Sequence, residues 1–271
     1  MVTSDVDVSP WHGACFNVCT GDIEDAPAPA AIHKFETSVT GGKIYVTADP
    51  SKTLSANKSR IHSSKSLPSA AATPSGGVVI VGGGAGGLVT LIGLRESRYP
   101  GTITILSAER HAPIDRTKLS KTLLTDLSKL EWYPESDIKE IFGAELRAGV
   151  HVASVDPGKK TVSLEGGANI SYDKLVLATG AAPRRLPIPG ANLTHVHTLR
   201  GVEDVKKIDA ALGQGKRLVV IGSSFIGMEL VVATSSRKLK EVHVIGREKY
   251  PFEAILGEKI GAALQKVRRM I

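Results

Sequence analysis

The chain has 271 residues, of which 42% are hydrophobic, 4% aromatic and 23% charged, and its formal net charge is +7. This composition is close to that of average globular proteins and excludes a wholly disordered or fibrous chain, while the length suffices for roughly one to two domains. Because few aromatic side chains are present to stack on bases, the positive charge is assigned to linker and surface, and no nucleic-acid partner is expected.

Membrane insertion and disulfide formation are also disfavoured. No apolar run approaches the ~20 residues that a membrane-spanning helix needs. The acidic start lacks the basic and apolar regions of a secretory signal. The two cysteines, Cys15 and Cys19, cannot form a disulfide framework, which fits a reducing compartment. We expect a cytoplasmic protein, with the mitochondrion as the alternative.

The first residues raise the question of a metal site. Residues 9–17 read SPWHGACFN, which places His12 close to Cys15, and Cys19 follows four residues later. Two cysteines in this spacing beside one histidine are not a strong zinc pattern, because structural zinc sites use four ligands.

The next segments predict a hairpin and a linker. Residues 35–48 read FETSVTGGKIYVTA, which favours two short strands around a Thr-Gly-Gly turn. Residues 49–76 are rich in Ser, Lys, Ala, Pro and Gly and are predicted to be a flexible linker between domains. His33 in the hairpin region and His62 in the linker are interpreted as solvated side chains.

From residue 77 onward, β-type runs alternate with helical patterns. The runs are VVIV, TITILS, KLVLAT, RLVVIG and EVHVIG. This alternation predicts an α/β fold with a mainly parallel sheet. One long-range similarity stands out between VVIVGGGAGG at 78–87 and LVVIGSSFIG at 218–227.

The first of these segments has a dinucleotide-binding pattern. Gly82, Gly84 and Gly87 satisfy G-x-G-x-x-G between a β-branched run and a helical pattern. The glycines permit a tight turn, a close approach of a pyrophosphate, and close packing of helix on strand. Glu109 follows Gly87 by 22 residues, a suitable offset for a carboxylate that binds a ribose hydroxyl.

The second segment is a weaker copy. Gly222 and Gly227 are present, but Ser224 occupies the middle position and adds a side chain where a backbone should approach the ligand. Glu248 follows Gly227 by 21 residues and favours NADH, because its carboxylate would repel a 2′-phosphate. Arg247 beside it leaves NADPH as an alternative cofactor.

Two such patterns in one chain suggest a flavin on the first and a nicotinamide on the second. Residues 78–256 resemble the pyridine nucleotide-disulfide oxidoreductase superfamily, in particular its apoptosis-inducing-factor-like and ferredoxin-reductase-like flavoproteins. Further segments that are similar to this family are PIDRTKLSK at 113–121, YDKLVLATGAAPRRLPIPG at 172–190, HTLRGVEDVKKI at 197–208 and the stretch PFEAILGEKIG.

The resemblance implies roles for individual residues. Arg116 and Lys121 would lie along the flavin, with Lys121 as the catalytic residue that stabilises negative charge on its reduced ring. Ile114 departs from the tyrosine usual at its position. The full set of expected cofactor-binding residues is Gly82, Gly84, Ala85, Gly86, Gly87, Glu109, Arg116, Lys121, Val152, Ala178, Thr179, Gly180, Gly222, Ser224, Phe225, Ile226, Gly227, Glu229 and Glu248.

The N-terminal segment is similar to the second ligand box of a Rieske domain, as in the Rieske-tailed branch of the apoptosis-inducing-factor family. A Rieske [2Fe-2S] centre uses two Cys and two His. Here Ser9 stands in place of the box cysteine, and only His12 remains as a degenerate metal position. No [2Fe-2S] cluster is expected.

The predicted fold class is therefore α/β, with a Rossmann-type FAD-binding domain over 77–200 and the first part of a second, NAD(P)-binding Rossmann-type domain over 201–271. A partial β-rich Rieske-like segment over 1–48 and the linker over 49–76 precede them. The chain is expected to be truncated relative to the family.

The function implied is an FAD-dependent NAD(P)H oxidoreductase that passes electrons from NADH through FAD to an iron-sulfur protein, a quinone or another one-electron acceptor. No cysteine occurs after Cys19, which excludes the redox disulfide of other superfamily members. The alternative is a non-catalytic nucleotide-binding fragment or pseudoenzyme that lacks the cluster and the C-terminal half of the reductase. The sequence gives no oligomeric state.

Overall fold

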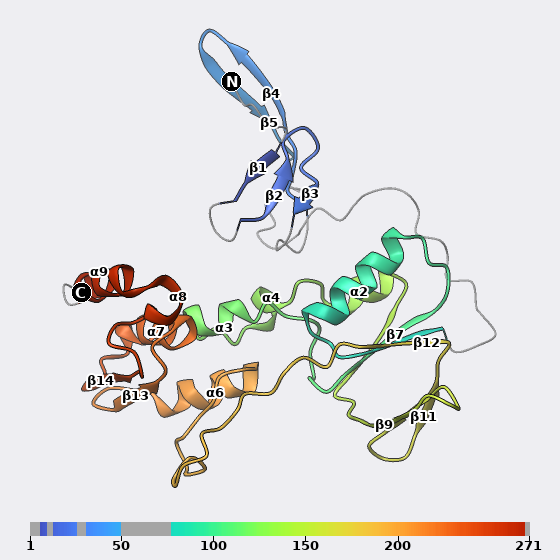
Figure 1. The fold of residues 1–271 in the computed structure, drawn as a ribbon. Helices are drawn as coiled ribbons and strands as arrows, with labels where there is room; N and C mark the ends of the chain where they lie inside the picture. Colours follow the sequence, from blue (N-terminus) through green and yellow to red (C-terminus); the bar gives the residue numbers. More distant parts are fainter. Residues whose placement is uncertain (1–5, 10–12, 26–30, 50–76, 269–271) are drawn as a thin grey trace. The chain divides into compact units, whose positions relative to one another are not determined.

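The computed structural model describes residues 6–9, 13–25, 31–49 and 77–268 (Figure 1). Its contacts divide the chain into two compact units. Unit 1 comprises residues 1–113 and 131–179, and unit 2 comprises residues 114–130 and 180–271. Most of the predicted linker, with His62, and the predicted metal position His12 lie outside the described residues.

The N-terminal part of unit 1 is built from short antiparallel strands. Strands β1 (Val6–Val8), β2 (Cys15–Asn17) and β3 (Ile23–Asp25) form one sheet, and β4 (Glu36–Thr40) and β5 (Lys43–Thr47) form a separate hairpin. Gly41 and Gly42 have φ values of 59° and 74°, a backbone conformation that glycine adopts without steric strain. The predicted hairpin with its Thr-Gly-Gly turn is confirmed.

The centre of unit 1 is a four-stranded parallel sheet. Its strand order is β12 (Lys174–Leu177), β6 (Val78–Val81), β7 (Ile103–Ser107) and β8 (Glu145–Ala148). All four residues of β6 are buried, which explains its unbroken VVIV run, since an inner parallel strand is covered on both faces. The predicted parallel α/β sheet is confirmed.

Two layers cover this sheet (Figure 1). Val78 and Ile80 pack with helices α2 (Ala85–Glu96) and α5 (Glu135–Glu140). Val79 and Val81 pack on the other face against a meander of strands that sequence analysis did not identify. These strands are β9 (Val152–Asp156), β10 (Thr161–Leu164) and β11 (Asn169–Ser171).

A buried arginine holds the end of α2. Arg95 is 2% exposed, and its guanidinium donates to the carbonyl oxygens of Tyr99, Gly101, Phe142 and Gly143 at 2.5–3.0 Å. Burial lowers the pKa of Arg95 because desolvation disfavours the charged form. The side chain therefore joins α2 to the loop before β8 through backbone acceptors.

Unit 2 contains a small parallel βαβ unit with helices around it. Strands β13 (Arg217–Ile221) and β14 (Glu241–Ile245) pair in parallel and are connected by α7 (Phe225–Ala233), as predicted. The remaining elements are α3 (Thr117–Thr122), α4 (Leu127–Leu130), α6 (Val202–Ala211), the 3-10 turn Ser235–Arg237, α8 (Glu253–Leu256) and α9 (Glu258–Arg268).

The core of unit 2 explains why its limits differ from the predicted domain limits. Ile114, Leu119 and Leu130 pack with Val202 and Val205 of α6 in one buried cluster. The segments 114–130 and 180–200, predicted as parts of the FAD-binding domain, therefore group with the second βαβ unit. The assignment of each domain to its cofactor stays a prediction.

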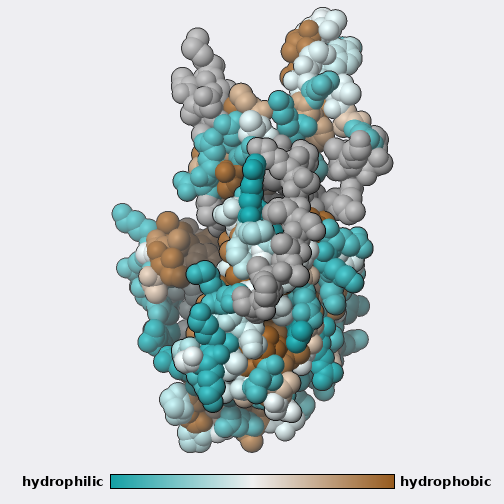
Figure 2. All heavy atoms as spheres, turned by 90° about the vertical axis from the view of Figure 1, so that its right-hand side faces the viewer, coloured by the Kyte–Doolittle hydropathy of each residue, from teal (hydrophilic) through white to brown (hydrophobic). Residues whose placement is uncertain are grey.

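Among the described residues, the surface carries both hydrophilic and large hydrophobic side chains. In the view of Figure 2, the residues that are not grey are mostly hydrophilic, and the hydrophobic ones lie in separate groups between them. Among the described residues, no helix combines the length and apolar character that crossing a bilayer would need.

Candidate functional site

The first glycine turn connects β6 to α2 and has little room for side chains. Gly82 has a φ of 123°, and a Cβ there would lie 2.0 Å from the carbonyl oxygen of Ala178. A Cβ on Gly87 would lie 2.0 Å from the carbonyl oxygen of Gly82. These two glycines are thus required by the tight turn and by close packing of the helix on it.

Gly84 differs from its neighbours, because nothing lies within 4 Å of a Cβ placed there. Ala85 and Gly86, which follow it in the first turn of α2, are exposed. The backbone N–H groups of a first helical turn have no acceptor within their helix and carry the positive end of its dipole. The turn therefore offers unpaired donors beside open space, which suits an anionic group.

Glu109 follows β7, the strand that neighbours β6. Its side chain is 29% exposed, and one carboxylate oxygen lies 3.9 Å from Nε2 of His111. Its backbone N–H donates to Oγ of Ser107 at 3.2 Å. The same Ser107 would be 2.3 Å from a Cβ on Gly83, so Gly83 is also needed, a requirement that the G-x-G-x-x-G pattern does not reveal.

The residues that follow β12 contact the first glycine turn. Ala178 and Thr179 follow β12 directly and border Gly82, and the Ala178 methyl group is 3.5 Å from a Cβ on Gly86. Gly180, in unit 2, has a φ of 70° and approaches Nη2 of Arg200. Val152, at the start of β9, instead packs against the core formed by the sheet and the meander.

The second glycine turn repeats the architecture of the first. Gly222 has a φ of 113°, and a Cβ on Gly227 would lie 2.2 Å from the carbonyl oxygen of Gly222. Ser224 is exposed at the position before α7 and makes no side-chain capping hydrogen bond. The turn is therefore accessible, although Ser223, Ser224 and Ile226 place side chains where the first turn has glycine.

Glu248 lies just beyond β14, where the second pattern places it. Its side chain is 27% exposed and lies 3.8 Å from Nη2 of Arg247, which is 96% exposed. Lys249 has its ammonium 5.0 Å from the ring centre of Tyr250 and 3.4 Å from the Glu258 carboxylate. Tyr250 and, to a smaller extent, Glu258 raise the pKa of Lys249.

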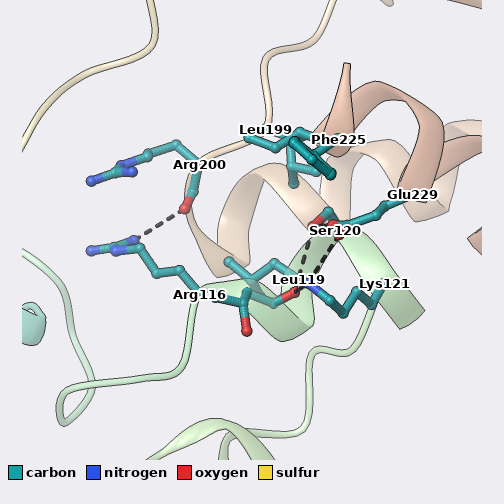
Figure 3. A pocket seen from close by; sticks show the side chains of 10 residues that line it. Arg116, Leu119, Ser120, Lys121, Leu199, Arg200, Phe225 and Glu229 are labelled. Atoms are coloured by element: carbon teal, nitrogen blue, oxygen red, sulfur yellow. Dashed lines mark hydrogen bonds and ion pairs between the residues drawn. The ribbon is translucent and has the colours of Figure 1, made fainter. Parts of the chain in front are cut away.

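A pocket of about 280 Å³ in unit 2 brings several predicted residues together (Figure 3). Helix α3 contributes Lys121, the segment before it contributes Arg116, and α7 contributes Glu229. Phe225 and Ile226 of α7 also line the pocket. The lining residues that sequence analysis missed are Thr117, Leu119, Ser120, Leu199 and Arg200.

The ammonium group of Lys121 has two acceptors in the protein. Its Nζ lies 3.0 Å from Oε1 of Glu229 and 3.2 Å from the carbonyl oxygen of Thr117. An ammonium group carries three protons. The side chain is 44% exposed, so the third proton can be donated to a ligand in the pocket.

Two guanidinium groups stand at another side of the pocket (Figure 3). Nη1 of Arg116 donates to the carbonyl oxygen of Arg200 at 3.1 Å. The carboxylate of Asp204 accepts from the backbone N–H groups of Arg200 and Gly201 at 2.9 and 3.0 Å. Glu229 is paired with Lys121, and Arg116 and Arg200 are two further basic residues in the pocket lining.

The missed residues carry little signal in the sequence. Ser120 is an ordinary small helical residue whose partner lies on α7 in the folded chain. Arg200 precedes Gly201, the N-cap residue of α6, and no spacing rule assigns a function to that position. Both become visible only when α3, α6 and α7 are packed together.

The metal position has no support in the described part of the chain. Within residues 6–9, 13–25, 31–49 and 77–268, no three Asp, Glu, His or Cys side chains are grouped to hold a metal ion. Cys15 and Cys19 are free thiols. His12 lies outside the described residues, so its role stays a prediction.

Comparison with known proteins gives a family match. The model of the pyridine nucleotide-disulphide oxidoreductase family matches residues 76–270. Human apoptosis-inducing factor 3 is 37% identical over 95% of this chain and 42% of its own length. The ferredoxin–NAD(+) reductase subunit of the benzene 1,2-dioxygenase system of Pseudomonas putida is 36% identical over 66% of this chain and 44% of its own length.

Solved structures agree with the sequence matches. A putidaredoxin reductase–putidaredoxin complex has a TM-score of 0.65 at 28% identity and covers 72% of this chain and 48% of its own. A ferredoxin reductase from Rhodopseudomonas palustris has a TM-score of 0.65 at 30% identity over 70% of this chain and 47% of its own. The chain thus spans less than half the length of these relatives.

Proposed function

Because the chain belongs to the pyridine nucleotide-disulphide oxidoreductase family, we propose that it is an FAD-dependent NAD(P)H oxidoreductase acting on a ferredoxin-type acceptor. The observation that carries this proposal is the pair of accessible glycine turns, each between a parallel strand and a helix, together with the cationic pocket of unit 2.

The described residues fit a dinucleotide. At the first turn, the open space over Gly84 leaves room for a pyrophosphate near the first N–H groups of α2. Glu109 follows the neighbouring strand, as ribose binding requires. We assign this turn to FAD, with Ala178 and Thr179 bordering the cofactor.

FAD, when bound, supplies the redox chemistry, since it accepts a hydride from a nicotinamide and can pass electrons on singly. The contribution of the chain is orientation and electrostatics. Lys121 donates a hydrogen bond to an acceptor atom in the pocket, and Arg116 and Arg200 add positive charge beside it. Such fixed donors stabilise negative charge that develops on a ligand during reaction.

The second turn is assigned to the nicotinamide cofactor. Gly222 and Gly227 preserve the turn, and Glu248 lies beyond β14 to accept from a ribose hydroxyl. We propose that NADH is preferred over NADPH, because the carboxylate repels a 2′-phosphate. Arg247, which is almost fully exposed, permits residual use of NADPH.

A one-electron acceptor outside the chain is favoured. Residues 77–271 contain no cysteine that could form a redox disulfide. Relatives named as ferredoxin–NAD(+) reductases and a solved reductase–putidaredoxin complex support an iron-sulfur protein as this acceptor. We propose the cytoplasm as the compartment and the mitochondrion as the alternative.

The N-terminal segment is proposed to be a Rieske-like piece without a cluster. Its support is the small antiparallel sheet β1–β3 followed by the β4–β5 hairpin, together with the quoted box around His12. Ser9 in place of a ligand cysteine argues against cluster assembly. Iron analysis of the purified protein tests this proposal.

The test of the main proposal is reconstitution with FAD, followed by NADH-dependent reduction of an artificial one-electron acceptor and of a [2Fe-2S] ferredoxin. We expect stoichiometric FAD and turnover with both acceptors. Binding of FAD or an adenine nucleotide without turnover would instead favour a non-catalytic nucleotide-binding role. Failure to bind FAD would refute the proposed oxidoreductase, and failure to bind any adenine nucleotide would refute both.

A further inference from the structure

Glu229 is held by two residues that follow each other on α3. Its Oε1 lies 3.0 Å from Nζ of Lys121, and its Oε2 accepts a hydrogen bond from Oγ of Ser120 at 2.5 Å (Figure 3). Each oxygen of the carboxylate thus has its own partner. The plane of the carboxylate is fixed by two contacts from one helical turn.

The hydroxyl group of Ser120 donates its hydrogen bond to the carboxylate of Glu229. A hydroxyl has one proton, and the other acceptor in reach, the carbonyl oxygen of Thr117, is 3.5 Å away. A separation of 2.5 Å is typical of a charge-assisted bond from a hydroxyl to a carboxylate. Ser120 is only 6% exposed, so water competes little for this bond.

Without this bond, Glu229 would be free to turn. A single exposed ion pair between two long side chains does not hold one geometry well, because both side chains keep rotational freedom. Glu229 could then swing into the pocket and place a negative charge there. Lys121 would lose its fixed direction at the same time.

We propose that Ser120 is a positioning residue that anchors Glu229 and thereby directs the third proton of Lys121 into the pocket. This inference rests on the proposed function for its significance, because the direction of that proton matters only if an acceptor binds in the pocket. The geometry itself belongs to unit 2 alone and can be tested without any cofactor.

The first experiment measures the acetylation rate of Lys121 by N-hydroxysuccinimide acetate in the protein without added FAD, followed by peptide mass spectrometry. Lys118, whose ammonium contacts the carbonyl oxygen of Lys129, is the internal reference on the same helix. In Ser120→Ala we expect acetylation of Lys121 to rise about two- to fivefold, the range set by loss of an exposed ion pair.

The controls separate Ser120 from its surroundings. Glu229→Gln should also raise the rate. Thr122→Ala removes a hydroxyl from the same helix that bonds only the Lys118 carbonyl, and it should leave the rate unchanged. Ser120→Cys is the substitute if Ser120→Ala fails to fold, because it keeps the side-chain size with a weaker donor. Its acetylation rate at Lys121 should lie between those of the wild-type protein and Glu229→Gln. An unchanged rate in folded Ser120→Ala or Ser120→Cys overturns the proposal.

The second experiment uses the FAD-loaded protein. We expect Ser120→Ala to make the midpoint potential of the bound flavin more negative and to lower kcat for flavin reduction about threefold, with KM for NADH and FAD content unchanged. An unchanged midpoint potential in Ser120→Ala would overturn the proposed effect of Ser120 on the bound flavin. If the wild-type protein binds no FAD, the proposed function fails, while the acetylation result still decides whether Ser120 anchors Glu229.

Discussion

The ammonium of Lys121 on α3 lies 3.0 Å from the carboxylate of Glu229 on α7, and these side chains are 44% and 27% exposed. A pair this accessible to water contributes little to folding stability, typically about 0–1 kcal/mol. Its significance is therefore its place at a pocket that also contains Arg116 and Arg200.

Replacing Lys121 tests the role of this pocket. In Lys121→Met we expect flavin reduction by NADH to slow about a hundredfold, because a fixed donor to developing negative charge is lost. The melting temperature should change little. Lys118→Met, on the same helix but outside the pocket, should keep the wild-type rate. Stopped-flow reduction measures both, and equal rates in the two variants would refute the role of Lys121.

A matched pair of glycines in α2 and its turn tests the phosphate site. A Cβ placed on Gly84 or on Gly93 would meet no atom within 4 Å, so alanine fits the protein at both positions. Gly84→Ala should weaken FAD binding about tenfold or more, since the methyl group occupies the space left for the pyrophosphate. Gly93→Ala should bind FAD normally and gain about 0.5–1 kcal/mol of stability. Similar FAD affinities in both, by fluorescence titration, would contradict this site.

The proposed preference for NADH over NADPH depends on Glu248, which lies just beyond β14. Glu248→Gln should raise the ratio of kcat/KM for NADPH to that for NADH about tenfold, because the repulsion of a 2′-phosphate is removed. Glu241→Gln, at the start of β14 and paired with Arg217, serves as the control. A ratio that stays at the wild-type value in Glu248→Gln would show that the carboxylate does not face the ribose.

Arg95 is predicted to be important for folding, not for chemistry. Arg95→Met leaves four backbone carbonyl oxygens without their donor, and we expect a loss of about 3 kcal/mol in the free energy of unfolding. Arg98→Met, three residues later and exposed, should be nearly neutral. Denaturant unfolding monitored by circular dichroism compares them, and a loss below about 1 kcal/mol in Arg95→Met would contradict this account.

Much of the parallel fold could be predicted from local patterns. The runs VVIV and RLVVIG predict β6 and β13. The helices α2 and α7 follow the first glycine pattern and its weaker second copy, as predicted. These features are readable because their causes are local: β-branched residues favour strands, and only glycine fits the turn geometry.

The features that escaped prediction depend on distant contacts. The meander β9–β11 lies against the sheet because Val162 and Tyr172 bury against Val79 and Val81, and short strands of mixed polarity give a weak pattern. The grouping of 114–130 with the second βαβ unit follows from the packing of α3 on α6 and α7. Such packing brings Ser120 to Glu229 across more than a hundred residues of chain, and no spacing rule reaches that far.

Anaerobic titration of the FAD-loaded protein with NADH tests the central claim most directly. The account predicts that about one equivalent of NADH removes the visible absorption of the bound flavin, and that Lys121→Met slows this change while Lys118→Met does not. A protein that binds FAD but keeps its yellow colour under excess NADH would contradict the claim that the two glycine turns belong to one electron-transfer enzyme.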